Sequence, residues 1–431
     1  MYLCNSKIDD MKPRLLILAL TLSSAFAASA QQPSLLAEDN LEPHTLRMLT
    51  SRPPSQRDLV AGCRHLALEV DANAFFLDSE RQMNQVKGYT VTGFRLSPAL
   101  AYGINERAQL RIGFNATAFA GLDSLYRLRP TFSLVYAPTR WLTLIGGTIC
   151  GSHTHQLAPI VYDPARWIFN YQEDGLQILT DTKIWRSDTW LDWTRYLTPW
   201  TPDQERFTMG TSHTLLLFNN VKEYTVRDFE SGEINDLKIK GWRIELPVHF
   251  IACHRGGEVK TIDTNTVTVF NERVGLRFAR HFSRNPRRSL NKLALDISVY
   301  QYHLEDRNVD RPGQAFNPTL SYEWLHFSKY QQPDWNLRAV AGFVHSNNYF
   351  SALGDPAYWN FSPYSALHIP NAKIPENSWL NNYFTFGLSA AHEFKGLDLG
   401  LQFNVINDLD VHDTDLFIGF FMRFNERFIL F

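Results

Sequence analysis

The chain has 431 residues, with 42 Lys and Arg against 44 Asp and Glu, so its formal net charge at pH 7 is only −2. A chain without a large charge of either sign is not drawn to nucleic acid, and we expect no nucleic-acid binding. Hydrophobic residues make up 44% of the chain, which excludes a largely disordered protein. The aromatic content of 13% is high for a soluble protein and ordinary for a β-barrel in a membrane.

The N-terminus has the layout of a cleaved signal peptide. Lys12 and Arg14 precede an apolar run that ends in the small residues Ala27 to Ala30, which predicts a signal peptide over residues 1–30. The acidic pair before Met11 is unusual in such a leader, so translation is expected to start at Met11. Residues 31–62 carry four prolines and few apolar runs, and we interpret them as a periplasmic N-terminal segment that precedes a barrel over residues 63–431.

After the leader, the dominant pattern alternates apolar and polar residues. Over residues 398–405, Leu399, Leu401 and Phe403 alternate with polar or small residues such as Gln402. A strand with this pattern has one face against an apolar medium and the other against water. No stretch of 18 apolar residues follows the leader, so a membrane location would require strands.

This alternation recurs throughout and predicts sixteen strands, with 14 or 18 left open because a single-chain bacterial barrel needs an even number. The predicted strands are 64–76, 88–101, 107–119, 128–138, 141–151, 175–185, 188–197, 205–218, 240–252, 264–280, 292–303, 314–327, 336–346, 382–394, 397–407 and 414–425.

The lengths of the connections support a closed, antiparallel, transmembrane β-barrel. The short links Tyr102–Glu106, Pro138–Arg140, Arg186–Ser187 and Lys395–Gly396 fall on one side, and the long links 152–174 and 347–381 fall on the other. Outer-membrane barrels have short periplasmic turns and long outer loops. Residues 219–239 break this rule, which indicates either a miscounted strand or a periplasmic segment. The aromatic loop 347–381 is expected to fold inward as a constriction.

Charged residues lie on the second face of the predicted strands. Unpaired charges in a dry core are costly, so this face is predicted to line a water-filled lumen, which a barrel of this size can enclose. The predicted lumen-lining residues are Arg95, Arg111, Asp181, Asp192, Arg243, Glu245, Arg277, Asp296, Glu323, Arg338, Glu393, Asp398 and Arg423.

The sequence shows no pattern typical of an enzyme or a metal site. Ser212 and His213 are adjacent on a strand and point to opposite faces, so they cannot act together as nucleophile and base. His153 and His155 lie two residues apart in a loop with no third ligand at a matching spacing, so we interpret them as a solvated pair rather than as metal ligands. The cysteines fit neither a disulfide framework nor a metal site. We therefore expect no catalytic residues, no metal and no cofactor.

The chain ends in Phe428, Ile429, Leu430 and Phe431. Here it resembles the outer-membrane β-barrels of Gram-negative bacteria, whose last strand ends in an aromatic residue that the barrel assembly machinery recognises. The better alternating run ends at Phe424, so Phe424 and Phe431 are both candidate assembly signals, and the last strand is expected to end at Phe424. Segments around Glu173, Trp190 and Glu205 resemble porin-like barrels of the Bacteroidota.

These observations favour a porin-like outer-membrane channel for the passive passage of small polar solutes. The resemblance implies contact with outer-membrane lipid, lipopolysaccharide and the assembly machinery, and it leaves a homo-oligomer open. Two other functions remain open: a polysaccharide export channel, which would favour a more cationic lumen, and a closed barrel with a binding, enzymatic or structural role. A soluble periplasmic β-protein would alternate equally well, but it would not need to separate long and short links.

Overall fold

The computed structural model describes residues 65–82, 88–151, 155–195, 204–227, 234–256, 267–282, 289–305, 312–327, 333–359, 380–394 and 397–430. The predicted signal peptide, the segment 31–62, His153 and Phe431 lie outside these residues.

The strands form one antiparallel sheet. They are β1 (Leu66–Glu80), β2 (Tyr89–Asn105), β3 (Ala108–Phe119), β4 (Arg127–Tyr136), β5 (Leu142–Thr148), β6 (Asp174–Asp181), β7 (Trp185–Arg195), β8 (Glu205–Asn219), β9 (Lys222–Arg227), β10 (Ile234–Gly256), β11 (Val267–Phe282), β12 (Ser289–Glu305), β13 (Gly313–Phe327), β14 (Pro333–Asn347), β15 (Leu380–Phe394), β16 (Leu397–Asp408) and β17 (Thr414–Ile429). Two short helical segments, α4 (Arg166–Phe169) and η2 (Pro356–Tyr358), lie in the connections.

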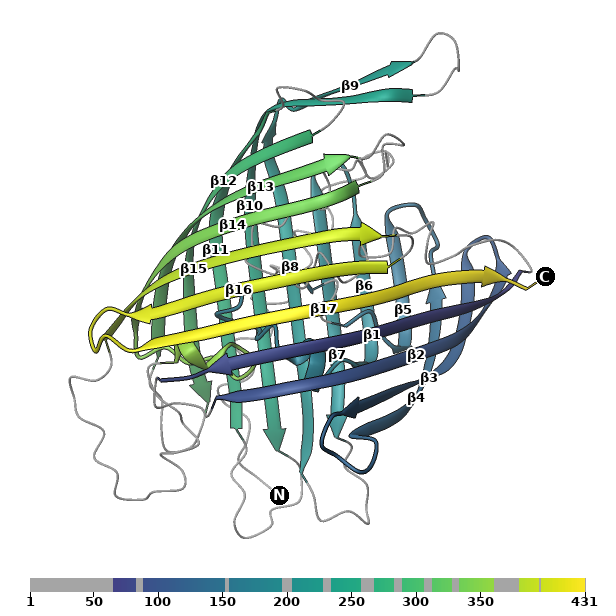
Figure 1. The fold of residues 1–431 in the computed structure, drawn as a ribbon, viewed down its shortest axis with the longest axis horizontal. Helices are drawn as coiled ribbons and strands as arrows, with labels where there is room; N and C mark the ends of the chain where they lie inside the picture. Colours follow the sequence, from purple (N-terminus) through teal and green to yellow (C-terminus); the bar gives the residue numbers. More distant parts are fainter. Residues whose placement is uncertain are drawn as a thin grey trace, which may run out of the picture.

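Sixteen of these strands close the barrel, as predicted. β1 pairs with β2 on one side and with β17 on the other, so the sheet has no free edge at the termini. β9 pairs only with the start of β10, whereas β8 pairs with β10 from Arg243 onwards. The β9 hairpin therefore extends beyond the barrel wall at the short-turn end (Figure 1), which accounts for the unexpectedly long predicted link 219–239.

Two predicted strand ends are wrong. The turn expected at Arg186–Ser187 lies earlier, because the Thr182 amide donates to the Trp185 carbonyl oxygen at 2.9 Å and closes the hairpin there. The last strand does not end at Phe424, since β17 pairs with β1 as far as Ile429. Arg427 does not interrupt the alternation, because it points inward and forms an ion pair with Glu69.

The alternation along each strand places apolar side chains outside and polar ones inside. On β11, Val274 and Leu276 are 54% and 41% exposed, whereas Arg273 and Arg277 are each 2% exposed. An apolar outer surface with a polar interior is the arrangement that a bilayer requires, and the protein is an outer-membrane β-barrel. Within the part of the chain that the structure describes, no helix is long and apolar enough to cross a bilayer.

Two long connections at the loop end fold into the barrel, and we call their described parts, residues 155–173 and 349–359, the plug. Leu157, Val161 and Tyr349 of the plug are each at most 1% exposed. The Asn271 side-chain amide of the wall donates to the Phe350 carbonyl oxygen at 2.7 Å. The described part of the predicted inward loop 347–381 therefore fills the interior.

The described members of the predicted lumen set face inward, but the structure places many of them in ion pairs rather than along an open channel. Asp296 accepts from Arg273 at 2.9 Å and from Arg277 at 3.2 Å, and Arg277 also contacts Glu245 at 3.4 Å. The buried members of the predicted set are Arg95, Asp192, Arg243, Glu245, Arg277, Asp296, Arg338 and Arg423. Arg111, Asp181, Glu323 and Asp398 are half-buried, and the side chain of Glu393 lies outside the description.

The outward orientation of β16 can be tested at Leu401, which is 55% exposed. We expect Leu401→Arg to lower the free energy of unfolding by about 2–4 kcal/mol, because it places a charge against the bilayer interior. Leu401→Phe should leave it nearly unchanged. Denaturant titrations of the protein in lipid vesicles measure both, and equal losses would contradict the assigned face.

Candidate functional site

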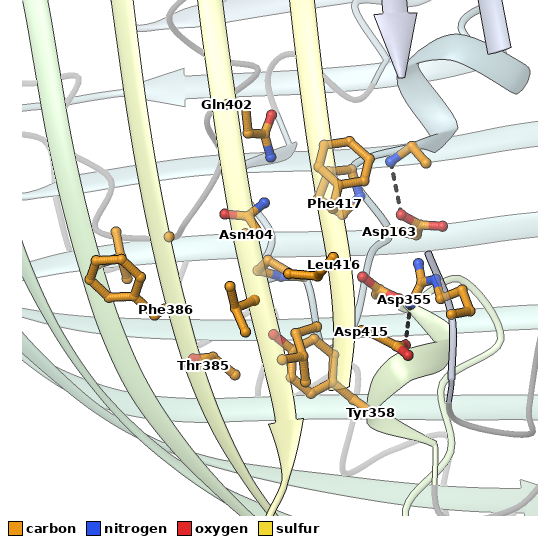
Figure 2. Close-up of a pocket in the computed structure, with 18 of the residues that line it drawn as sticks. Asp163, Asp355, Tyr358, Thr385, Phe386, Gln402, Asn404, Asp415, Leu416 and Phe417 are labelled. Atoms are coloured by element: carbon orange, nitrogen blue, oxygen red, sulfur yellow. Dashed lines mark hydrogen bonds and ion pairs between the residues drawn. The ribbon is translucent and has the colours of Figure 1, made fainter. Parts of the chain in front are cut away.

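A pocket opens inside the barrel at the loop end, between the inner wall of β14 to β17 and the plug (Figure 2). We call it the wall pocket. Its lining residues include Arg81, Tyr89, Asp163, Val340, Asp355, Tyr358, Thr385, Gly387, Gln402, Asn404, Asp415 and Phe417. In Figure 2 the carboxylates lie on one side of the pocket, and Gln402 and Asn404 lie opposite them on β16.

The plug side of the pocket is built from two copies of one short sequence. Residues 163–167 and 355–359 both read Asp-Pro-Ala-x-Trp. In each copy the Asp carboxylate accepts from the amide two residues later, at 2.8 Å for Asp163 and 3.0 Å for Asp355. Pro favours such a turn because its backbone angle is already set.

The two copies meet through reciprocal backbone hydrogen bonds. The Asp163 amide donates to the Leu353 carbonyl oxygen at 2.6 Å, and the Asp355 amide donates to the Pro159 carbonyl oxygen at 2.9 Å. This pairing brings Asp163 and Asp355 to the same side of the pocket, although 192 positions separate them in the chain.

Arg81, at the end of β1, ties the plug to the barrel wall. Its guanidinium lies 2.8 Å from an Asp355 oxygen and 3.2 Å from an Asp415 oxygen. The second Asp415 oxygen accepts from the Gln82 amide at 2.9 Å. Asp415 therefore accepts on both oxygens, whereas Asp355, within the described residues, accepts from Arg81 and from the Ala357 amide on Oδ1 alone. Both carboxylates pair with a guanidinium, which suits them to positioning rather than to proton transfer.

Asp163 differs from these two carboxylates in that it forms no ion pair with a residue that the structure describes. Only its Oδ1 accepts a hydrogen bond in the described part of the chain, from the Ala165 amide, so Oδ2 is free to take a proton. Burial and the nearby Asp355 raise the pKa of Asp163 to about 7. A carboxyl group that titrates near neutral pH is suited to general acid and base chemistry.

Tyr89 adds a hydrogen-bond donor beside these acids. It is the first residue of β2, and its buried hydroxyl has no hydrogen-bond partner within the described residues. A phenol in this state can donate to an oxygen atom of a bound molecule.

A second interior cluster surrounds His155. Its Nε2 lies 2.7 Å from Glu173 and its Nδ1 lies 3.0 Å from Asp188, while its ring stacks on Trp190 with centroids 3.6 Å apart. Although burial lowers the pKa of His155, the two carboxylates raise it to about 9. The expectation that His155 is solvated is therefore wrong. With both nitrogens occupied, its imidazolium fastens the plug to β7 and has no lone pair to act as a base.

His213 is also unsuited to act as a base. Its Nδ1 accepts from the Trp185 indole at 3.2 Å, so the proton lies on Nε2, which is 3.0 Å from the Thr211 hydroxyl. Its ring stacks against Trp185 on the outer surface, whereas Ser212 is buried on the inner face. The side chains of Ser212 and His213 thus point to opposite faces of β8, as expected for adjacent residues of a strand.

None of the predicted lumen residues lines the wall pocket. Sequence reasoning missed Asp163, Asp355 and the polar residues of β15 and β16. The repeated Asp-Pro-Ala-x-Trp sequence in the two longest loops was a signal that could have identified the two acids, because it marks two equivalent turns.

Comparison with known proteins identifies a family. The family model described as Lipid A 3'-O-deacylase-type matches residues 56–431. No curated protein matches the sequence.

Among solved structures, OpdL of Pseudomonas aeruginosa is 10% identical, with a TM-score of 0.46 and coverage of 85% of this chain and 99% of that one. OprB of Pseudomonas putida is 8% identical, with a TM-score of 0.45 and coverage of 84% and 94%. OmpT of Vibrio cholerae with loop L8 deleted is 8% identical, with a TM-score of 0.43 and coverage of 84% and 100%. Likenesses at this level carry no conclusion about activity.

The ion pairs of His155 predict that the stability of the protein depends on pH. The pKa of His155 is about 9 in the folded protein against a reference value of 6.5. Its contribution to stability is therefore complete below pH 6.5 and is lost as the pH rises through 9. We expect the free energy of unfolding to fall over this interval more steeply in the native protein than in His155→Gln. Parallel pH profiles in denaturant titrations would contradict this role.

Proposed function

The chain belongs to the Lipid A 3'-O-deacylase-type family, and on this ground we propose that it is an outer-membrane hydrolase that removes an ester-linked acyl chain from lipid A. The family match runs from residue 56 to the last residue and is the observation that carries the proposal. Lipid A, or the lipopolysaccharide that contains it, is then the substrate and not only the surrounding lipid.

Two expectations from the sequence are corrected by this finding. The protein is not a passive porin, and the expectation that it has no enzymatic activity is wrong. The alternative of a closed barrel with an enzymatic role agrees with the family and with an interior occupied by the plug. The inward charges misled the interpretation because their ion pairs, which join residues far apart in the sequence, are not visible in the sequence.

Asp163 is the proposed general base. Its free Oδ2 takes a proton from water, and the water oxygen attacks the carbonyl carbon of the acyl ester. The bond between that carbon and the sugar oxygen then breaks, and Asp163 returns the proton to the sugar oxygen. The products are a free fatty acid and a sugar hydroxyl, so atoms and charge balance.

Groups beside Asp163 are proposed to polarise the ester carbonyl and to position the acids of the pocket. The Tyr89 hydroxyl is available to donate to the oxygen on which negative charge develops. The Arg81 guanidinium forms ion pairs with Asp355 and Asp415 and so fixes the positions of these two carboxylates in the pocket. Burial and the charge of Asp355 together raise the pKa of Asp163. The second copy of the repeated turn therefore contributes to the proton affinity of the carboxylate in the first copy.

The orientation of the barrel is part of the proposal. The loop end, which holds the wall pocket, is taken to face the outer leaflet, and the short-turn end with both barrel termini is taken to face the periplasm. A cleaved signal peptide over residues 1–30, recognition by the barrel assembly machinery through Phe424 or Phe431, a homo-oligomer and the absence of nucleic-acid binding stay predictions.

We expect Asp163→Asn to lower the rate of deacylation about 10²- to 10⁴-fold, because an amide cannot accept the proton from water. Mass spectrometry of lipid A incubated with purified protein counts the acyl chains removed. In the native protein, kcat/KM should rise with pH through about 7 and then level off, since only ionised Asp163 is active.

Asp123→Asn is the matched control, because Asp123 is an exposed acid in the β3–β4 connection at the same end of the barrel. It should retain full activity. Native-like activity of Asp163→Asn would remove Asp163 from the mechanism, and failure of the folded native protein to deacylate lipid A would remove the proposed function itself.

A further inference from the structure

Three polar side chains on the inner wall of the wall pocket have unused hydrogen-bonding capacity. Thr385 of β15 and Gln402 and Asn404 of β16 make no side-chain hydrogen bond within the described part of the chain. Gln402 is only 2% exposed, and its Oε1 is fully buried without a partner. Buried polar groups in folded proteins are usually paired, so a set left unpaired around a pocket indicates a ligand.

The wall is shaped to keep these side chains accessible. Gly342 lies opposite Thr385, and Gly387 lies opposite Asn404, in the pairing of adjacent strands. A Cβ at Gly387 would lie 2.5 Å from the Asn404 Oδ1, and a Cβ at Gly342 would lie 2.7 Å from the Thr385 Oγ1. Glycine at these two positions gives the amide and the hydroxyl the space that they occupy.

The chemistry of these groups selects among ligands. Amides and hydroxyls both donate and accept hydrogen bonds and carry no charge, so they match groups that do the same, such as sugar hydroxyls and N-acyl amides. An acyl chain would leave all three groups buried and unpaired, which is costly. The rings of Tyr358 and Phe417, which also line the pocket, offer apolar surface to a sugar ring.

We infer that Thr385, Gln402 and Asn404 form a sugar subsite, which binds the hydroxyl and amide groups of an acylated amino sugar opposite Asp163. This inference rests on the proposed function, since it names the part of the substrate that the wall holds. The sugar lies against β15 and β16, and its acyl ester faces the plug. In Figure 2, Gln402 and Asn404 lie across the pocket from Asp163 and Asp355, which leaves the sugar between the amides and the acids.

The first test compares two esters. We expect Gln402→Leu to raise KM for lipid A about tenfold or more, because an apolar side chain cannot replace the hydrogen bonds of the amide. The kcat/KM for p-nitrophenyl butyrate, an ester without a sugar, should fall much less than that for lipid A. Equal losses on the two esters, or no loss on lipid A, would overturn the subsite.

The second test measures binding without catalysis. N-acetylglucosamine should bind the folded Asp163→Asn protein, and adding Thr385→Val or Gly387→Ala should raise its Kd about tenfold. Thr319→Val is the matched control, because Thr319 lies on β13, outside the pocket lining, and its hydroxyl already donates to Asn317 at 3.0 Å. Unchanged binding in both pocket variants would overturn the inference.

The two tests separate the subsite from the activity. If the native protein hydrolyses neither ester while N-acetylglucosamine binding depends on Thr385 and Gly387, the proposed hydrolase fails and the sugar subsite stands. If lipid A is deacylated and N-acetylglucosamine does not bind, the hydrolase stands and the subsite fails.

Discussion

Closure of the sheet in a bilayer is the constraint on which the rest of this structure depends. Because β1 pairs with β17, the described wall has no free edge at the termini, its strands pair with neighbours on both sides, and the outer surface can be apolar. Most charged side chains of the strands then face inward. The interior therefore holds many charges in a small volume, and it is stable only if they are paired or hydrated.

The interior meets this requirement in two ways. On the wall, guanidinium groups and carboxylates of neighbouring strands pair directly, as Arg273 and Arg277 do with Asp296. Between the plug and the wall, His155 is held by Glu173 and Asp188, and Arg81 at the end of β1 is held by Asp355 and Asp415. These ion pairs fasten the plug to the wall, together with hydrogen bonds such as that from Asn271 to Phe350.

The wall pocket brings together several polar groups that lack a partner among the described residues. Asp163 keeps one oxygen without a donor, Tyr89 keeps a hydroxyl without an acceptor, and Gln402 keeps a buried amide oxygen without a partner. Leaving such groups unpaired costs free energy of folding, and these three face a pocket in which a substrate can pair with them. The histidines that first suggest catalysis, His155 and His213, have both ring nitrogens engaged.

The amino-acid sequence by itself determined the class of fold, the number of barrel strands and the inward or outward direction of most side chains, because a period of two residues is a local property that a bilayer makes strict. It predicted that Arg277 and Asp296 face inward and that the loop from residue 347 folds inward. Only the tertiary structure decided what the interior does. The ion pair between Arg81 and Asp355 and the meeting of Asp163 with Asp355 join residues from distant parts of the chain. Pairing across a closed barrel depends on three-dimensional distance, which no local pattern records. These pairings distinguish a filled interior with a reactive pocket from an open channel.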